Sequence, residues 1–228
     1  MTIAGRLGIL GGTFDPIHLG HLAIAEAAAD ELELERVLFV PARFPPHRSS
    51  PPRASAEDRA TMVELAIAGN PRFAMSTVEL ESAGPSFTAD TVETLSRDER
   101  AAGRRPDLWF IVSAEAFAGF LDWNDPARIL GAARLVVLPR EGHPPPDLAP
   151  LAAALPGLAD RVSVLDGPRI RLSATEIRRR AGRGLSVRYL VPDAVAAYIA
   201  ERRLYRSNDQ PHEIPKEAPA SSDRPAIR

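Results

Sequence analysis

The chain has 228 residues, of which 45% are hydrophobic and 25% charged, and its formal net charge is −2. This length and composition fit one globular α/β domain with a sizeable core. A net charge so close to zero excludes the broad basic field that duplex DNA or an anionic membrane would require. The absence of cysteine excludes disulfides, thiolate metal sites and thiol nucleophiles.

The N-terminal residues enter a strand-like run directly and lack the long apolar core of a signal peptide. No other stretch approaches the length of a membrane span. We therefore expect a cytoplasmic protein that contacts neither membrane nor nucleic acid. The sequence is compatible with a monomer or a homo-oligomer.

Short apolar runs predict β-strands, and most are continuous rather than alternating, as is typical of strands buried on both faces of a parallel sheet. They are residues 6–10, 36–40, 72–78, 108–113, 134–139 and 161–166. Helical patterns separate or follow them at residues 18–34, 55–69, 88–103, 173–182 and 192–205. This alternation predicts a Rossmann-like, doubly wound α/β sheet with ligands at the carboxyl ends of the strands.

The expected domain covers residues 1–206. Proline-rich stretches at 41–52 and 139–150 follow the second and fifth predicted strands, so the first of them begins at the ligand-binding edge. Residues 207–228 are polar and proline-rich, with too little apolar surface to bury, and they predict a disordered tail.

The stretch "GGTFDPIHLGH" (11–21) connects the first predicted strand to the first predicted helix. Gly11 and Gly12 predict a turn that lets a ligand approach the backbone, and Asp15-Pro16 predicts a helix start with Pro16 near its first position. A helix N-terminus offers free N–H groups and a positive dipole end to anions. His18 and His21 are spaced to share one face of that first turn.

Three interpretations of the two histidines remain open: surface or capping residues, metal ligands, or phosphate ligands. A metal site lacks support, because no further His or Cys is spaced to complete a ligand set. No P-loop lysine follows the glycines, so imidazoles would have to neutralise a bound phosphate. Since polyphosphate favours the imidazolium form, binding and protonation would be coupled.

"GGTFDPIHLGHL" resembles the HxGH signature of the adenylyl- and cytidylyltransferase superfamily, and in its longer form the nicotinate-nucleotide adenylyltransferases. That resemblance implies transfer of AMP from ATP to nicotinic acid mononucleotide, forming deamido-NAD and pyrophosphate. It also implies Mg²⁺ bound through the ATP phosphates, without a protein metal site. The alternatives are a phosphopantetheine adenylyltransferase-like enzyme and a non-catalytic nucleotide-binding protein of the same fold.

A second stretch, "RLSATEIRRR" (171–180), is similar to the ISxTxIR motif of the same superfamily. Ser173 and Thr175 offer hydroxyls at a predicted helix start, and Arg178 follows one turn later as a permanent cation. Ser173 and Glu176 also form a capping box, a feature that many helices carry for stability alone. The resemblance implies that His18, His21 and Arg178 are catalytic. It assigns ATP binding to Gly11, Gly12, Thr13, Phe14, Glu115, Ser173 and Thr175.

Further stretches, "PPHR" (45–48), "PSFT" (85–88), Trp123 and "LPREG" (138–142), resemble the family's mononucleotide side. The implied ligands are Arg43, His47, Arg48, Phe87, Thr88, Trp123 and Arg140. Each has a structural alternative: a solvated proline-rich loop, Thr88 as a simple N-cap, or Trp123 in the core. The chain departs from the family at Ser113-Ala114-Glu115, where Gly-Ala-Asp is usual beside the ATP ribose.

Overall fold

The structure is a computed structural model that describes residues 5–45, 51–82 and 84–206. Its strands form one six-stranded sheet in the order β3-β2-β1-β4-β5-β6, and neighbouring strands pair in parallel. The bounds are β1 (Arg6–Gly12), β2 (Arg36–Pro41), β3 (Phe73–Met75), β4 (Asp107–Ser113), β5 (Arg134–Leu138) and β6 (Val162–Val164). This order confirms the predicted Rossmann-like, doubly wound sheet.

The five helices expected from the sequence are present: α1 (Leu19–Glu31), α2 (Ala56–Ile67), α3 (Thr88–Ala101), α7 (Ala174–Gly182) and α8 (Asp193–Glu201). The sequence patterns do not predict α4 (Ala114–Phe117), α5 (Pro126–Ala132), α6 (Ala149–Ala154) or the 3₁₀ turns Phe120–Asp122 and Ala159–Arg161. These elements are too short for an apolar period to emerge over several turns. No helix in the described ranges is long and apolar enough to span a bilayer.

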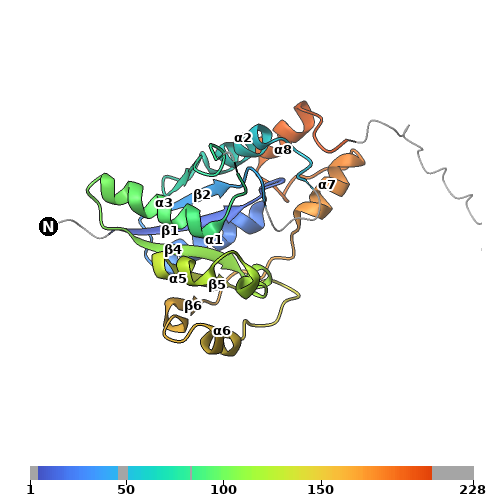
Figure 1. The fold of residues 1–228 in the computed structure, drawn as a ribbon. Coiled ribbons are helices and arrows are strands. Elements are labelled where there is room, and N and C mark those ends of the chain that lie inside the picture. The colour runs from blue at the N-terminus through green and yellow to red at the C-terminus, as the bar shows by residue number, and fades with distance from the viewer. Residues whose placement is uncertain (1–4, 46–50, 83, 207–228) are drawn as a thin grey trace, which may run out of the picture.

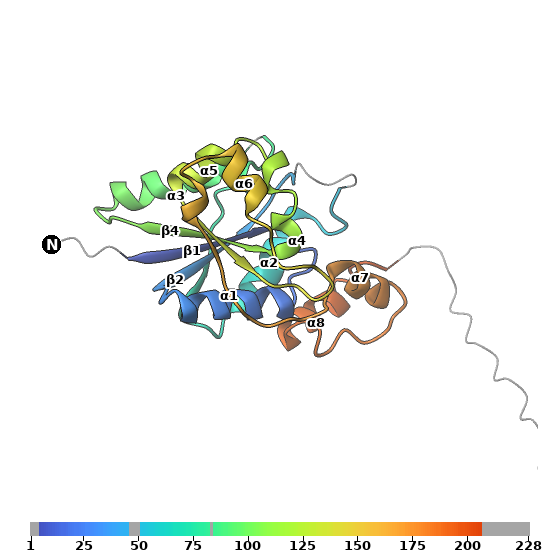
Figure 2. The same cartoon turned by 90° about the horizontal axis from the view of Figure 1, so that it is seen from below.

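The sheet is the middle of three layers, with α3, α5 and α6 on one face and α1, α7 and α8 on the other (Figures 1 and 2). Helix α1 buries Ala25, Ala28 and Ala29, whose small side chains allow its backbone to approach the strands closely. Helix α3 buries Val92 and Leu95 in the second core on the opposite face. The sheet is therefore packed between two apolar cores, one on each face, which fix the positions of the strand ends.

The strand order reverses between β1 and β4, which are hydrogen-bonded neighbours at the centre of the sheet. The chain moves outward from β1 to β3 on one side and from β4 to β6 on the other. Loops that leave adjacent strands in opposite directions open a crevice at this switch point. The stretch from Thr13 and the segment from Ser113 both start there, and α7 lies beyond the same ends of the strands (Figure 2).

Candidate active site

Helix α1 begins at Leu19 with His18 as its N-cap, so the prediction that Pro16 occupies the first helical position is wrong. Asp15 has a different role, because its buried carboxylate accepts hydrogen bonds from the N–H groups of Arg53 (2.9 Å) and Ala54 (3.1 Å). The Asp15-Pro16 turn is therefore anchored to the segment that precedes α2, and the helix starts three residues after Pro16.

The rings of His18 and His21 stack at the start of α1, with centroids 3.7 Å apart and planes inclined by 20°. His18 is 4% exposed, and its ring occupies space that a side chain at Gly20 would need: a Cβ there would lie 3.0 Å from Nδ1 of His18. Phe14 packs edge-on against His21 at 5.1 Å. The glycine between the two histidines is thus explained by the stacked pair itself.

Hydrogen bonding and charge fix the protonation of the pair. The backbone N–H of His18 donates to Nδ1 of His21 (3.2 Å), so a neutral His21 carries its proton on Nε2. Burial, assisted by the charge of Arg140, lowers the pKa of His18 to about 4. Burial, followed by the charges of His18 and Arg140, places the pKa of His21 well below its usual value. Both imidazoles are therefore neutral near pH 7.

Gly11 and Gly12 end β1 instead of forming the predicted turn, and the left-handed backbone falls on Phe14 (φ 49°). A Cβ on Gly12 would lie 3.1 Å from the ring of Phe14, and one on Gly11 would lie 3.3 Å from Phe110. These glycines make room for aromatic rings of the protein. Phe14 is 2% exposed, so its side chain belongs to the core and only its main chain can face a ligand.

Arg59 on α2 supports this turn and was missed in the sequence analysis. It is 1% exposed, and its guanidinium donates to the carbonyls of Thr13 (2.7 Å), Ala42 (2.6 Å) and Arg43 (3.4 Å). It thereby ties the loop after β1 to the loop after β2. The sequence signal was weak, because an arginine in a helix is usually exposed.

Helix α7 brings Arg178 to the same turn. Ser173 is the N-cap and accepts a hydrogen bond from the N–H of Glu176 (3.2 Å). The carboxylate of Glu176 does not complete the expected capping box, because it binds Arg179 instead. Arg178 donates to the carbonyl of Asp15 (2.7 Å) and to the hydroxyl of Thr175 (3.1 Å). The start of α7 is thus tied to the Asp15 turn, which leads directly to the stacked histidines.

Arg140 and Glu115 form an ion pair, with 2.8 Å between Nη1 and Oε2. The resemblance assigned Glu115 to ATP and Arg140 to the mononucleotide, and the structure brings the two side chains together. Ser113, the other departure from the family pattern, is the N-cap of α4 and accepts a hydrogen bond from the N–H of Ala116 (3.3 Å). Both departures therefore have structural partners.

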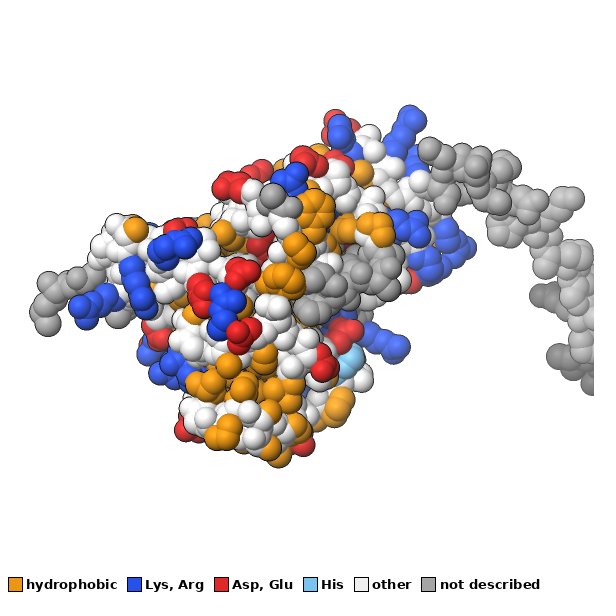
Figure 3. All heavy atoms as spheres, in the orientation of Figure 1, with side chains coloured by type: hydrophobic (Ala, Val, Ile, Leu, Met, Phe, Trp, Pro, Cys, Tyr) orange, Lys and Arg blue, Asp and Glu red, His pale blue; other side chains and the backbone are white. Residues whose placement is uncertain are grey.

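A cleft of about 980 Å³ adjoins this cluster between the loop after β5 and α7. Its charged lining comprises four arginines and two glutamates, so that it is net basic: Arg140, Arg171, Arg180, Arg188, Glu141 and Glu176. Basic side chains also gather over the α7 end of the molecule (Figure 3). A lining of this charge suits a polyanionic ligand.

Three of the residues assigned to the mononucleotide lie after β2 and at the start of α3: Arg43, Phe87 and Thr88. Phe87 is the N-cap of α3 and Thr88 its first residue, so the alternative of Thr88 as a simple N-cap is wrong. The N–H of Ser86 donates to the carbonyl of Phe44 (3.1 Å), which holds the two loops side by side. Arg43 donates to the carbonyl of Leu80 (2.8 Å). His47 and Arg48 lie outside the described residues.

Trp123 is half-buried against the second core. Its ring lies 5.5 Å from the ring of Phe120 and 6.2 Å from that of Phe110, edge-on in the latter case. The side chain is thus anchored by aromatic packing on one side while remaining partly accessible. Core packing and a ligand contact are compatible in this arrangement.

The fold and the site together define the class: residues 9–180 match the family described as cytidylyltransferase-like. Among curated relatives, a protein of Rubrobacter xylanophilus named "Probable nicotinate-nucleotide adenylyltransferase" is 45% identical over 89% of this chain and 93% of its own. A protein of Herpetosiphon aurantiacus with the same name is 45% identical over 88% and 98%. The chain therefore belongs to the nicotinate-nucleotide adenylyltransferase family.

The fold also matches solved structures. Plasmodium falciparum nicotinic acid mononucleotide adenylyltransferase, complexed with NaAD, superposes with a TM-score of 0.69 over 88% of this chain and 97% of that one. The sequences are 15% identical, so this likeness concerns the fold.

Proposed function

We propose that this protein transfers AMP from ATP to nicotinic acid mononucleotide, forming deamido-NAD and pyrophosphate, as a cytoplasmic enzyme. The observation that carries the proposal is the stacked, neutral His18–His21 pair, which follows the Asp15 turn that Arg178 binds at the switch point of the sheet. The names of the relatives support the same reaction.

The reaction is an in-line displacement at the α-phosphorus of ATP. An oxygen of the mononucleotide 5′-phosphate attacks, the bond from the α-phosphorus to the bridging oxygen breaks, and pyrophosphate leaves with the bonding electrons. The nucleophile is already an anion, so no protein base has to remove a proton. Catalysis then consists of positioning the two phosphates and stabilising charge in the transition state.

His21 supplies a hydrogen-bond donor for the α-phosphate. Its Nδ1 is occupied by the backbone N–H of His18, which leaves Nε2–H to donate. Nδ1 of His18 is buried and has no hydrogen-bond partner among the described residues, and a triphosphate oxygen would provide one. The main chain at Gly12 and Thr13, in the same connection between β1 and α1, would contribute further N–H groups. Phosphate binding raises the pKa of both rings, so affinity and protonation are coupled.

The departing pyrophosphate would be held at the start of α7. Arg178 is oriented by the Asp15 carbonyl and the Thr175 hydroxyl, and a guanidinium can still offer further N–H donors to phosphate. Ser173 and Thr175 place hydroxyls at the N-terminus of the same helix. Arg178 is therefore set before ATP binds.

Mg²⁺ belongs to this proposal through ATP. Among the residues that the structure describes, no three His, Asp or Glu side chains gather in a way that could hold a metal ion. The proposal places Mg²⁺ on the phosphate oxygens of ATP, the kind of ligand that this ion prefers. Bound in this way, it would neutralise charge on the β- and γ-phosphates.

On the mononucleotide side, the main-chain N–H groups at Phe87 and Thr88 would receive the pyridine carboxylate, and Trp123 would stack on the ring. Arg43, His47, Arg48 and Arg140 complete the proposed ligand set. A cationic pyridinium next to an indole face is favourable.

The test is pyrophosphate release from Mg-ATP with nicotinic acid mononucleotide, nicotinamide mononucleotide or phosphopantetheine as acceptor. We expect the highest kcat/KM with nicotinic acid mononucleotide. A preference for phosphopantetheine would assign the other enzyme class. ATP binding without turnover on any acceptor would indicate a non-catalytic nucleotide-binding protein.

A further inference from the structure

Glu79 is a buried acid that the proposed mechanism does not use. It lies between β3 and α3, is 9% exposed, and its Oε1 is 2.6 Å from Oγ1 of Thr91. Buried carboxylates normally pair with a cation. Within the described ranges, no Lys, Arg or His lies within ion-pair distance of Glu79. The carboxyl group of Glu79 is therefore held by a hydrogen bond with the Thr91 hydroxyl and not by an ion pair.

Counting hydrogens at Thr91 indicates the charge of this carboxyl. Oγ1 of Thr91 lies 2.6 Å from Oε1 of Glu79 and 3.1 Å from the carbonyl oxygen of Phe87. A threonine hydroxyl has one hydrogen, whereas a carboxylate and a carbonyl are both acceptors. With an ionised Glu79, one of the two contacts would lack a hydrogen. With a protonated Glu79, the acid donates to Thr91 and Thr91 donates to Phe87.

We propose that Glu79 is a positioning residue that works in its protonated form and, through Thr91, holds the Phe87 turn at the start of α3 in the geometry that receives the nicotinate carboxylate. The inference rests on the function proposed above. Phe87 is the N-cap of α3 and its side chain makes no capping hydrogen bond, so the turn depends on such outside contacts. An uncharged Glu79 also keeps a buried negative charge away from an anionic ligand.

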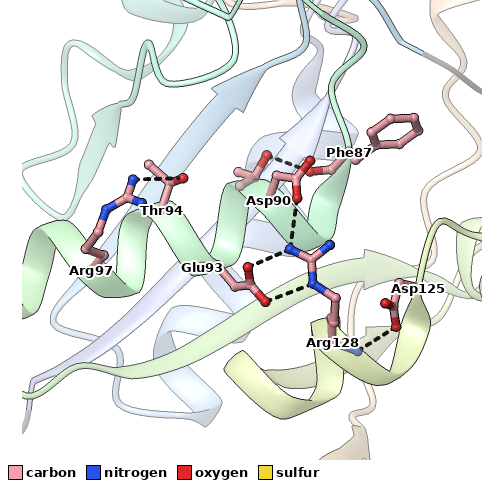
Figure 4. Close-up of polar contacts among 8 residues, drawn as sticks. Phe87, Asp90, Glu93, Thr94, Arg97, Asp125 and Arg128 are labelled. Carbon is pink, nitrogen blue, oxygen red and sulfur yellow. Dashed lines mark hydrogen bonds and ion pairs between the residues drawn. The ribbon is translucent and has the colours of Figure 1, made fainter.

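The surroundings favour the neutral form. Burial raises the pKa of Glu79, and it outweighs the opposing effects of the Thr91 and Ser86 hydroxyls. On α3, Asp90 and Glu93 are bound by Arg128 of α5 at 2.9 and 2.6 Å, and the Phe87 ring projects away from that network (Figure 4). The negative charges of Asp90 and Glu93 are thus already neutralised by Arg128.

Two further charged residues are close to Glu79. Arg43 binds the residue that follows Glu79, and Glu81 is two positions further along the chain. Arg43, from the loop after β2, is bonded to the carbonyl of Leu80. Glu81 is exposed and accepts a hydrogen bond from the hydroxyl of Thr77 at 2.6 Å. Glu81 therefore has the same chemical partner at the same distance as Glu79 without its burial, which makes it a matched control.

The kinetic test compares wild type, Glu79→Gln and Glu81→Gln between pH 5.5 and 9, with nicotinic acid mononucleotide as the varied substrate. Gln is neutral at every pH and can still donate to Thr91. We expect the wild-type KM to rise about three- to tenfold relative to that of Glu79→Gln as pH increases, the range for one lost hydrogen bond. The value of kcat should change little, and Glu81→Gln should follow wild type.

A second pair of variants tests the link through Thr91. Thr91→Ser keeps the hydroxyl and should retain the wild-type KM, whereas Thr91→Val should raise it at every pH. If Glu79→Gln showed the wild-type pH profile, or Thr91→Val the wild-type KM, the positioning role would be overturned.

A ¹³C NMR titration of the glutamate carboxyl carbons gives a readout that does not need turnover. The Glu79 signal should titrate at higher pH than the Glu81 signal, and coincident midpoints would overturn the proposal. If no pyrophosphate is released with nicotinic acid mononucleotide at any pH, the proposed function fails. The titration still reports the protonation of Glu79 in that case.

Discussion

At the scale of single residues, the unusual feature is that the proposed phosphate site is built on neutral imidazoles. Lysine would bring a permanent charge, whereas His18 and His21 are held neutral by burial and by Arg140. A neutral pair avoids the cost of burying two like charges 3.7 Å apart. Charge can then develop when the polyphosphate arrives, which ties electrostatic stabilisation to the bound substrate.

Replacing His21 tests the catalytic role. We expect His21→Ala to lower kcat by about 10²–10³-fold, the usual loss when one preorganised donor to a developing charge is removed. The melting temperature should change little, because His21 is a polar residue in the first turn of α1 and belongs to neither apolar core. Full activity in a folded His21→Ala protein would refute the mechanism.

His18 should make stability depend on pH in a defined window. Its pKa is about 4 in the folded protein and 6.5 in a model peptide, so the unfolded chain binds the extra proton between these values. The free energy of unfolding therefore falls as pH drops from about 6.5 to 4, by about 3 kcal/mol for this group. Urea unfolding at pH 7 and 4.5 measures the loss.

The matched variants for that measurement are His18→Asn and His143→Asn. His143 is exposed, so its replacement should leave the pH dependence of stability unchanged. His18→Asn should make the free energy of unfolding depend less on pH. An equal slope in wild type and His18→Asn would show that burial of His18 does not carry the effect.

At the scale of elements, α7 shows how one helix serves stability and the site together. Ser173 satisfies the N–H of Glu176, while Thr175 and Arg178 face the turn after β1. We expect Ser173→Ala to lower the free energy of unfolding by about 1 kcal/mol, the usual value of an N-cap. It should also raise the KM for ATP.

Ser173→Asp separates the two roles of this residue. Aspartate is as good an N-cap as serine, so stability should be retained. Its negative charge would oppose a phosphate, so the KM for ATP should rise further than in Ser173→Ala. A KM for ATP that follows stability across both variants would reduce Ser173 to a cap alone.

At the scale of the whole molecule, Asp15 links the turn after β1 to the C-terminal part of the described chain. Its carboxylate accepts a hydrogen bond from the hydroxyl of Tyr205 at 2.9 Å, and its carbonyl accepts one from Arg178. Burial and the Asp15 charge raise the pKa of Tyr205, so the phenol remains a donor. The C-terminal segment thereby closes over the turn that carries the histidines.

Tyr205→Phe should lower the free energy of unfolding by roughly 1.5–3 kcal/mol, the contribution of a hydrogen bond to a charged group. Thermal unfolding measures this as a drop of several degrees. Truncation after Arg206 is the control, because the composition of residues 207–228 predicts a dispensable segment. A truncated protein as unstable as Tyr205→Phe would show that the last residues also contribute to the fold.

The sequence by itself determined the parallel sheet and the five longer helices, because patterns among neighbouring residues encode them. It also contains the two motifs on which the proposed phosphate site rests. Apolar runs and the HxGH spacing are local properties. The short helices α4, α5 and α6 were not predicted, because each has too few residues for an apolar period to emerge.

Only the tertiary structure decided which polar groups meet. Asp15 proved to be an anchor rather than a helix start, and Glu115 proved to be the partner of Arg140. The burial of Arg59 and Glu79 likewise depends on segments that come together only in the fold. A buried polar group is stable only with its hydrogen-bond partners. Those partners can lie far along the chain, as the 190 residues between Asp15 and Tyr205 show.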